Sequence, residues 1–315
     1  ISPPKDNYIH KLFERKGWLH QLDSFGWDEP DLSKTSSTSV RKFEDDTELN
    51  QIVSKFVEVC LQQLVYEDGI PQAFEWILNE IAGNVLVHSE IGYGFAQVET
   101  YNENDELAMV ISDPGIGIPA SMSSKFSFRS DEEALSKSLE KGVTSKPDYG
   151  QGNGLAGVLS IVQHNNGGYL SITSGKARLT SRNGKVSIEK HLPPHNGTFV
   201  EIQFATNKII DLPSALGGHK PVDYMEIEFE DDAGDLNIEL TDYAPSLGNR
   251  VTAEKIRNLI LNLMKQNSGK SILVDMSKIG VISSSFADEL FGKLFVILGP
   301  MGFSKGIKLS NLNDT

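Results

Sequence analysis

Three polar side chains, Glu80, Asn84 and His88, recur at four-residue steps within residues 74–89, FEWILNEIAGNVLVHS. The apolar residues between them follow three- and four-residue steps, which predicts a helix with the polar three in one column on its opposite face. A carboxylate, an amide and an imidazole in one row suit a binding or catalytic site better than a core. The alternative is the ordinary solvated face of an amphipathic helix, and this stretch alone does not decide between the two.

The first of two glycine-rich loops begins at Asp113, directly after a predicted strand, and contains Gly115 and Gly117. The glycines allow the backbone to turn sharply and to approach a ligand. A carboxylate in a closed pocket can accept a hydrogen bond from an exocyclic amine such as that of adenine. An ordinary Asp-Pro-Gly turn is the alternative interpretation.

The second loop has glycines at three alternate positions, Gly150, Gly152 and Gly154, immediately before a predicted helix. Free backbone N–H groups and the positive end of the helix dipole would face an anion there, which predicts a phosphate cradle. The spacing is not G-x-G-x-x-G and the loop follows no strand, which argues against a dinucleotide-binding fingerprint. There is also no G-x-x-x-x-G-K-[ST] run.

The helices and strands that must position these motifs can be predicted from the spacing of apolar residues, which changes along the chain. Helix periodicity predicts helices over residues 8–19, 47–64, 74–89 and 155–164, and alternation predicts strands over 94–101, 106–112, 169–174, 185–190 and 198–204. Residues 113–154 form a long polar loop with a short helical patch at 131–140, a length typical of a functional lid or of disorder. This part is therefore expected to be α+β, an antiparallel sheet with helices on one face.

The turn-rich residues 211–221 are the best domain boundary. After them, strand-like segments alternate with helical ones, which predicts a smaller α/β domain. The expected strands are 224–229, 236–240, 271–276 and 307–309, and the expected helices are 252–266 and 286–298. The predicted organisation is an N-terminal extension at 1–40, a first domain at 41–210, a linker at 211–222 and a second domain at 223–315.

Composition limits the classes of function. With 29 Lys and Arg against 43 Asp and Glu, the formal net charge is −14, which argues against non-specific binding to nucleic acid or anionic lipid. Cys60 is the single cysteine, so an internal disulfide and a cysteine-based zinc site are excluded. No apolar run reaches the length of a membrane span, and a cytoplasmic protein is expected. The chain begins with Ile1 and not Met, so it is compatible with a fragment.

Four motifs in order resemble the N, G1, G2 and G3 boxes of GHKL ATPases, the family that includes gyrase B, MutL, histidine kinases and anti-sigma-factor serine kinases. Their order, spacing and predicted secondary structure agree over residues 40–205. The matching motifs are Glu80-x-x-x-Asn84-x-x-x-His88, Asp113-x-Gly115-x-Gly117, Gly150-x-Gly152-x-Gly154 and Gly197-Thr198. The resemblance implies a Bergerat-type α/β sandwich that binds ATP with Mg²⁺.

The resemblance also implies roles for individual residues. Glu80 would be the general base and Asn84 the Mg²⁺ ligand, whereas His88 is a nucleotide-site residue without a defined role. Asp113 would bind the adenine amine, with Thr198 nearby through a water. Gly115 and Gly117 would pass beside the base, while the triphosphate would be wrapped by Gly150, Gly152, Asn153, Gly154 and Leu155 and approached from the lid by Thr144, Ser145 and Lys146.

The histidine that ends the N box resembles the serine-kinase branch of the family more than the histidine kinases. No helix pair with a phospho-acceptor histidine is recognisable ahead of the domain. The second domain resembles the STAS-like modules of anti-sigma-factor antagonists, on residues 272–290, ILVDMSKIGVISSSFADEL. Ser284 falls at the position of their phosphorylated serine, although the flanking Asp and Gly are absent. The alternative is that Ser285 and Asp288 form a helix-capping pair without another role.

Two functions are consistent with these residues. In the first, the protein is an Mg²⁺-dependent ATP-using regulator, either a serine kinase or a partner-switching protein. In the second, ATP binding and hydrolysis drive a conformational or dimerisation switch without kinase activity. The two differ in whether Glu80 activates a protein hydroxyl or water. A third interpretation, a domain that keeps nucleotide only as a structural element, is disfavoured because Glu80 and Asn84 are both present. Besides ATP, the expected partner is a protein that binds through the STAS-like domain; a homodimer is compatible, and nucleic acid and membranes are not expected.

Overall fold

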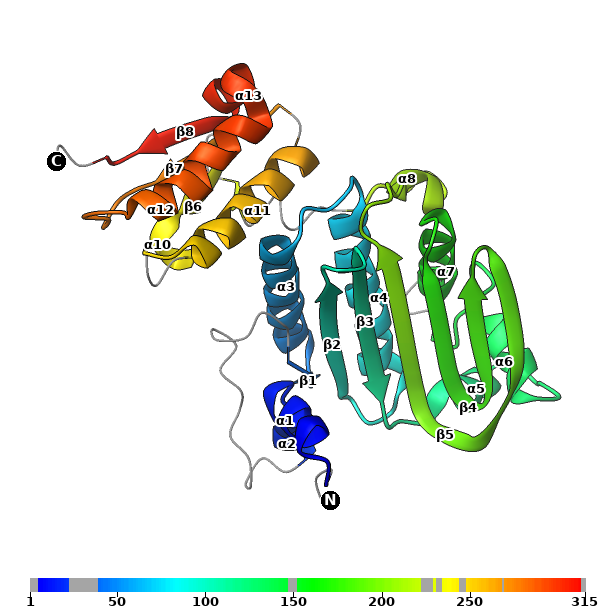
Figure 1. The fold of residues 1–315 in the computed structure, drawn as a ribbon. Helices are drawn as coiled ribbons and strands as arrows, with labels where there is room; N and C mark the ends of the chain where they lie inside the picture. Colours follow the sequence, from blue (N-terminus) through cyan, green and yellow to red (C-terminus); the bar gives the residue numbers. More distant parts are fainter. Residues whose placement is uncertain are drawn as a thin grey trace. The chain divides into compact units, whose positions relative to one another are not determined.

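The computed structural model describes residues 5–22, 39–146, 152–221, 229–230, 234–243, 248–267 and 269–312 (Figure 1). The chain divides into two compact units. The first comprises Ile1–Val59 and Gly69–Lys220, and the second comprises Cys60–Asp68 and Pro221–Thr315. A short segment from the first half of the sequence, residues 60–68, therefore packs with the C-terminal residues.

The first unit contains a five-stranded antiparallel sheet in the order β1-β2-β3-β5-β4. The strands are β1 (Arg41–Phe43), β2 (Gly94–Tyr101), β3 (Glu106–Asp113), β4 (Tyr169–Arg182) and β5 (Lys185–Ala205). Burial alternates along β2 and β3, so one side of each strand faces the core, as the period-two pattern predicts. The expected antiparallel sheet is confirmed.

Strands β4 and β5 form one long hairpin, so the prediction of separate strands at 185–190 and 198–204 is wrong. The pairing register shifts around Gly175, whose φ of +57° marks a bulge. Beyond this bulge β4 continues to Arg182 while β5 passes through Pro193 and Pro194. The bulge and the two prolines interrupt the alternation in the sequence without ending the strands.

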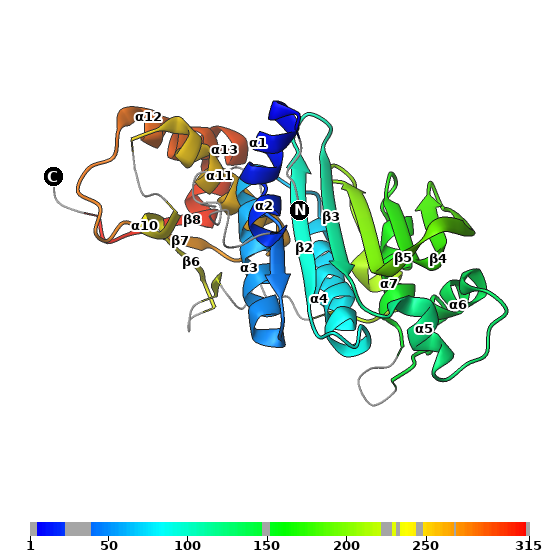
Figure 2. The same cartoon turned by 90° about the horizontal axis from the view of Figure 1, so that it is seen from below.

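Helices α4 (Ile70–His88) and α7 (Gly154–His164) lie against one face of this sheet (Figure 2). Helix α4 begins four residues before its predicted start, because Pro71 sits in its first turn, where a missing N–H costs nothing. Helix α3 (Asp46–Gln63) precedes it, and the short α8 (Leu212–Ala215) follows β5. The apolar side of α4 supplies Ile77, Leu78 and Ile81 to the core.

The other helices of this unit differ in detail from the predicted ones. The N-terminal helix is broken at Gly17, where φ is +76°, into α1 (Asn7–Arg15) and α2 (Trp18–Leu22). The long loop contains an unpredicted helix, α5 (Gly117–Ser123), as well as the expected α6 (Asp131–Ser138). Residues 147–151 of that loop lie outside the described residues.

The second unit contains a parallel three-stranded sheet in the order β6-β7-β8 and is α/β, as expected. Its elements are β6 (Leu236–Glu239), α10 (Leu240–Tyr243), α11 (Arg250–Gln266), β7 (Ile272–Asp275), α12 (Ser284–Ala287), a π-helical turn (Asp288–Gly292), α13 (Lys293–Gly306) and β8 (Ile307–Ser310). The strand predicted at 224–229 falls almost wholly outside the described residues. Helix α13 runs past its predicted end, with a kink at Gly299 and Pro300.

The predicted capping pair of Ser285 and Asp288 is wrong. The cap is Ser283, whose hydroxyl accepts a hydrogen bond from the N–H of Phe286 at 3.1 Å. Ser283 has extended backbone angles, whereas the helix has already begun at Ser284, so only Ser283 has the geometry of an N-cap. Within the described parts of both units, no helix is both long and apolar enough to span a membrane.

Candidate functional site

Glu80 and Asn84 lie where α4 meets the first turn of α7. A β-carbon on Gly154 would lie 2.5 Å from the Oε2 atom of Glu80 and 3.6 Å from Nδ2 of Asn84. One turn later in α7 and one turn earlier in α4, a β-carbon on Gly157 would lie 2.5 Å from the ring of Trp76. The two glycines therefore let α7 approach α4 closely, and the last glycine of the second loop directly faces the two polar residues of α4.

Burial raises the pKa of Glu80, and the positive charge of His219 opposes that shift. His219 follows α8 in a segment that packs on the start of α7. Leu216 of this segment lies against Gly157, and the Nζ atom of Lys141 would be 3.7 Å from a β-carbon on Gly217. A partly desolvated carboxylate with a raised pKa is a stronger proton acceptor than an exposed one, which suits a general base.

Asp113 occupies a core-facing position at the end of β3 and is 4% exposed. Burial raises the pKa of Asp113, whereas hydrogen bonds from Gly115 and Thr198 lower it. The Gly115 N–H donates to Oδ1 at 2.8 Å, and Thr198 is the partner of Asp113 in the β3–β5 register. A buried carboxylate held by two neighbours has a fixed direction, as recognition of a polar ligand edge requires.

The first glycine loop packs without space for side chains. A β-carbon on Gly117 would lie 2.7 Å from Oγ of Ser174 and 2.9 Å from the carbonyl oxygen of Gly197. Ser174 is fully buried and donates to the Gly197 carbonyl at 2.8 Å, while its Oγ also accepts from the N–H of Ile118 at 2.8 Å. The loop, β4 and the Gly197-Thr198 pair of β5 thus meet at one point.

Ser89, the C-cap of α4, joins the helix to the same loop. Its carbonyl accepts from the N–H of Ile116 at 3.1 Å, and a β-carbon on Gly115 would lie 2.3 Å from that carbonyl oxygen. The polar face of α4 and the Asp113 loop are therefore held in a fixed relation to each other.

His88 faces the lid. Its Nδ1 lies 3.2 Å from Oγ of Ser145, which in turn lies 3.0 Å from Oγ of Ser121 in α5. Lys146 donates to the carbonyl of Val87, and burial and the nearby Lys146 charge lower the pKa of His88. At neutral pH His88 is therefore the uncharged partner of a serine hydroxyl.

Other predicted phosphate-site residues contact the lid itself. Thr144 accepts from the Lys146 N–H at 3.1 Å, and both Oδ1 of Asn153 and the carbonyl of Gly152 accept from the N–H of Gly142 at 3.1 Å. Leu155 lies half-buried in the first turn of α7. Gly150 lies outside the described residues, and Ser284 is exposed in the second unit at the first position of α12.

Comparison with known families agrees with this geometry. Residues 69–207 match the family described as histidine kinase-, DNA gyrase B-, and HSP90-like ATPase. The chain carries a GHKL-type ATPase domain. Residues 252–315 match a STAS-like domain of unknown function, DUF4325, so a STAS-like domain is present as well. No curated protein compared with the chain matches it.

The residues of the ATPase domain fit a nucleotide with its cation. The buried carboxylate of Asp113 can accept from an amine, and the glycines at positions 115, 117 and 154 have no space for a side chain. Among the described residues no three His, Cys, Asp or Glu side chains cluster as a metal site. The amide oxygen of Asn84 and the oxygens of a phosphate are hard ligands of the kind that Mg²⁺ prefers.

Sequence reasoning missed three residues of the ATPase domain site. Ser174 carries no motif, although its position opposite Gly197-Thr198 at the end of a predicted strand was a signal. The sequence pattern marked Ser89 only as the last residue of a predicted helix. His219 lies in the turn-rich stretch that marks the domain boundary, and nothing in the pattern relates it to Glu80.

Proposed function

We propose that the protein binds ATP with Mg²⁺ in the ATPase domain and uses it in a regulatory switch, as a serine kinase or partner-switching regulator. The observation that carries this proposal is the convergence of Glu80 and Asn84 on Gly154. It brings a base, an amide ligand and the N-terminal end of a helix to one point, and phosphoryl transfer needs these groups together.

At the other end of the site, Asp113 would accept a hydrogen bond from the adenine amine. Its hydrogen bonds from Gly115 and Thr198 support this role because they hold the carboxylate in one orientation. Thr198 would add a contact to the base through a water. Gly117 packs directly on Gly197, so a side chain at position 117 would collide with the Gly197 carbonyl.

Glu80 would accept the proton of the attacking hydroxyl while a phosphoryl group passes from ATP to that oxygen and ADP leaves. Bound Mg²⁺ would supply charge neutralisation on the phosphates. The raised pKa of Glu80 supports the base role, because a carboxylate with a pKa nearer neutrality accepts a proton more readily. Lys146 and Ser145 of the lid would approach the phosphates after leaving Val87 and His88.

The kinase interpretation is supported by Ser284. Its side chain is exposed at the first position of α12, in the domain that matches the STAS-like family. The serine of this chain, or that of a partner STAS protein, is the proposed acceptor. A phosphate on it would lie at a helix N-terminus, which favours negative charge.

The alternative, an ATP-driven conformational or dimerisation switch without kinase activity, is supported by the lid. Ser145 contacts His88, and Lys146 contacts Val87, both in the last turn of α4. A nucleotide that draws these lid residues to its phosphates would have to break both contacts. Water would then be the nucleophile that Glu80 activates.

ATP labelled on the γ-phosphate distinguishes the two. The kinase proposal expects label on Ser284, lost in Ser284→Ala, or on an added STAS protein. Label that appears only as free phosphate, with Ser284→Ala unchanged, selects the ATPase switch. If Glu80→Gln consumes ATP as fast as the unchanged protein, Glu80 is not the base in either version.

A further inference from the structure

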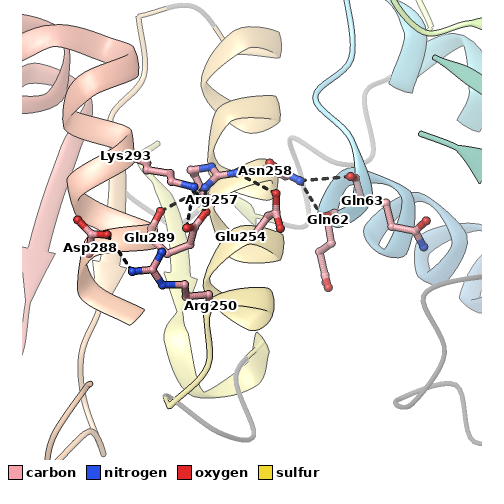
Figure 3. A network of polar contacts seen from close by, with 9 residues as sticks. All are labelled: Gln62, Gln63, Arg250, Glu254, Arg257, Asn258, Asp288, Glu289 and Lys293. Carbon is pink, nitrogen blue, oxygen red and sulfur yellow. Dashed lines mark hydrogen bonds and ion pairs between the residues drawn. The ribbon is translucent and has the colours of Figure 1, made fainter. Parts of the chain in front are cut away.

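The C-terminal end of α3 is capped by side chains from α11. An α-helix leaves its last four carbonyl groups without intrahelical partners. Nδ2 of Asn262 donates to two carbonyls at 2.8 and 2.6 Å. Nδ2 of Asn258 lies 3.2 Å from each of the two carbonyls between them, those of Gln62 and Gln63 (Figure 3). The four carbonyls belong, in order, to Leu61, Gln62, Gln63 and Leu64. All these residues belong to the second unit, so the helix end is built into it.

Asn262 also fixes the chain beyond the helix. Its Oδ1 accepts from the N–H of Tyr66 at 2.8 Å, and Asn262 is fully buried while Tyr66 is 1% exposed. The Tyr66 hydroxyl donates to the carbonyl of Cys60 at 3.2 Å. Only an amide side chain can donate twice and accept once in this place, because a carboxylate has no donor and an apolar chain has neither.

The fixed segment leads directly into the helix of the nucleotide site. Helix α4 begins at Ile70, four residues after Tyr66. The residue before it, Gly69, has φ of +80°, and a β-carbon there would lie 2.0 Å from the carbonyl oxygen of Ile210. The chain therefore has no space for a side chain at the residue directly before α4. Asn262 bonds to Tyr66 just before this point, and Glu80 lies three turns into the helix after it.

The opposite side of α11 contacts the π-helical turn that follows Ser284. Arg257, next to Asn258, forms an ion pair with Glu289 of the π-helical turn, and both are buried (Figure 3). Lys293 reaches the same carboxylate at 2.7 Å. A buried ion pair adds little net stability but fixes the register of the elements that it joins. The turn after Ser284 and the end of α3 are thus attached to one helix.

We infer that α11 is a positioning helix for the ATP site. Asn262 and Asn258 hold the α3–α4 connection, so that a structural change at the π-helical turn after Ser284 is transmitted through α4 to Glu80 and Asn84. The effect on turnover rests on the proposed function, whereas the effect on α4 does not. The inference assigns Asn262 a positioning role at a residue outside the nucleotide site. Residues 60–68, which the second unit includes, lie directly before Gly69 and α4 in the sequence.

Amide hydrogen exchange on the full chain tests the inference without nucleotide. Asn262→Asp keeps the size of the side chain but removes both donors to the α3 carbonyls. Exchange in the first two turns of α4 is expected to accelerate at least tenfold, while the amides of the β2–β3 pair stay unchanged. Asn267→Ala is the matched control, because Asn267 is also buried in this unit and its side-chain amide donates to Leu263 of its own helix, at 3.0 Å.

Equal acceleration of α4 exchange in Asn262→Asp and Asn267→Ala would overturn the inference, and so would no acceleration in either. If Asn262→Asp does not fold, Asn258→Ala takes its place, because it removes only the two 3.2 Å contacts. A threefold acceleration confined to the start of α4 is then expected, and unchanged exchange there contradicts the inference.

ATP turnover provides the functional arm. Asn262→Asp is expected to lower kcat at least tenfold with a smaller change in KM, whereas Asn267→Ala leaves kcat unchanged. Failure of the unchanged protein to bind ATP would defeat the proposed function, but the exchange experiment would still decide whether α11 positions α4. Faster exchange combined with unchanged kcat would overturn the link from α11 to Glu80.

Discussion

Gly154 stands so close to Glu80 that a β-carbon there would lie 2.5 Å from the carboxylate oxygen Oε2. Two motifs that are 74 positions apart in the sequence therefore share one small volume at the start of α7. The relationship explains why the position is glycine in structural terms: any side chain would displace either the helix or the Glu80 carboxylate.

Gly154→Ala should consequently impair turnover more than stability. The added methyl group would shift Glu80, and a misplacement of about 1 Å can cost on the order of 10²-fold in rate. Gly83→Ala is the matched control, because it lies in the same helix as Glu80 and nothing is within 4 Å of its β-carbon position. That control should be neutral or stabilising by about 0.5–1 kcal/mol in thermal unfolding. Equal turnover in both variants would show that the contact between Gly154 and Glu80 does not affect turnover.

Glu80→Gln should lower phosphate release by about 10²- to 10⁴-fold, because an amide cannot accept the proton of the nucleophile. Nucleotide affinity should change little, since a base acts mainly on the transition state. Single-turnover kinetics with the protein in excess over ATP measure the first quantity, and titration with a non-hydrolysable analogue measures the second. A tenfold loss of affinity with normal turnover would assign Glu80 to binding instead.

The pH profile should report the environment of Glu80. The base must be ionised, so turnover is present above its pKa and lost as the pH falls through it. Burial raises that pKa, which places the acid limb above the usual glutamate value of 4.5. His219→Gln removes a positive charge that lowers the pKa, so the limb should move to higher pH. His164→Gln, at the far end of α7, is the control, and a limb that stays in place in His219→Gln would refute the coupling.

Ser145→Ala should loosen the lid. The substitution removes the contacts of Oγ with His88 at 3.2 Å and with Ser121 at 3.0 Å. Tryptic cleavage at the exposed Lys141 should accelerate several-fold in the absence of nucleotide. Ser123→Ala removes a hydroxyl that bonds only within its own helix, to Pro119, and should leave cleavage unchanged. The same rate in both variants would show that these contacts do not hold the lid.

The sequence was most informative where chemistry demands particular residues at a particular spacing. Glu80, Asn84 and Asp113 were singled out by the resemblance of four ordered motifs to the GHKL boxes, because the helix column and the loop after a strand each allowed an ordinary structural alternative. The antiparallel sheet followed from alternation. Ser174 and His219 could not, because their roles depend on strand pairing and on how the segment after β5 folds back. The bulge at Gly175 hid the continuity of β4, and the cap at Ser283 was misplaced because three serines in a row offer the same signal.

The contact between Asn262 and the α3–α4 connection illustrates the same limit. Both asparagines of α11 look like polar residues of an amphipathic helix, and only the fold shows that carbonyls almost 200 positions earlier accept from them, with a sequence separation of 201 for Leu61. Non-local hydrogen bonds of this kind leave no periodic pattern.

Calorimetric titration with ATP in the presence of Mg²⁺ tests whether the ATPase domain binds the nucleotide. One site per chain is expected for the unchanged protein. Affinity should fall about 10- to 100-fold in Asp113→Asn, since a hydrogen bond to a charged group contributes about 1.5–3 kcal/mol. Affinity in the unchanged protein should also weaken as the pH falls through the raised pKa of Asp113. Absence of binding, or binding that is the same in Asp113→Asn, would contradict the account.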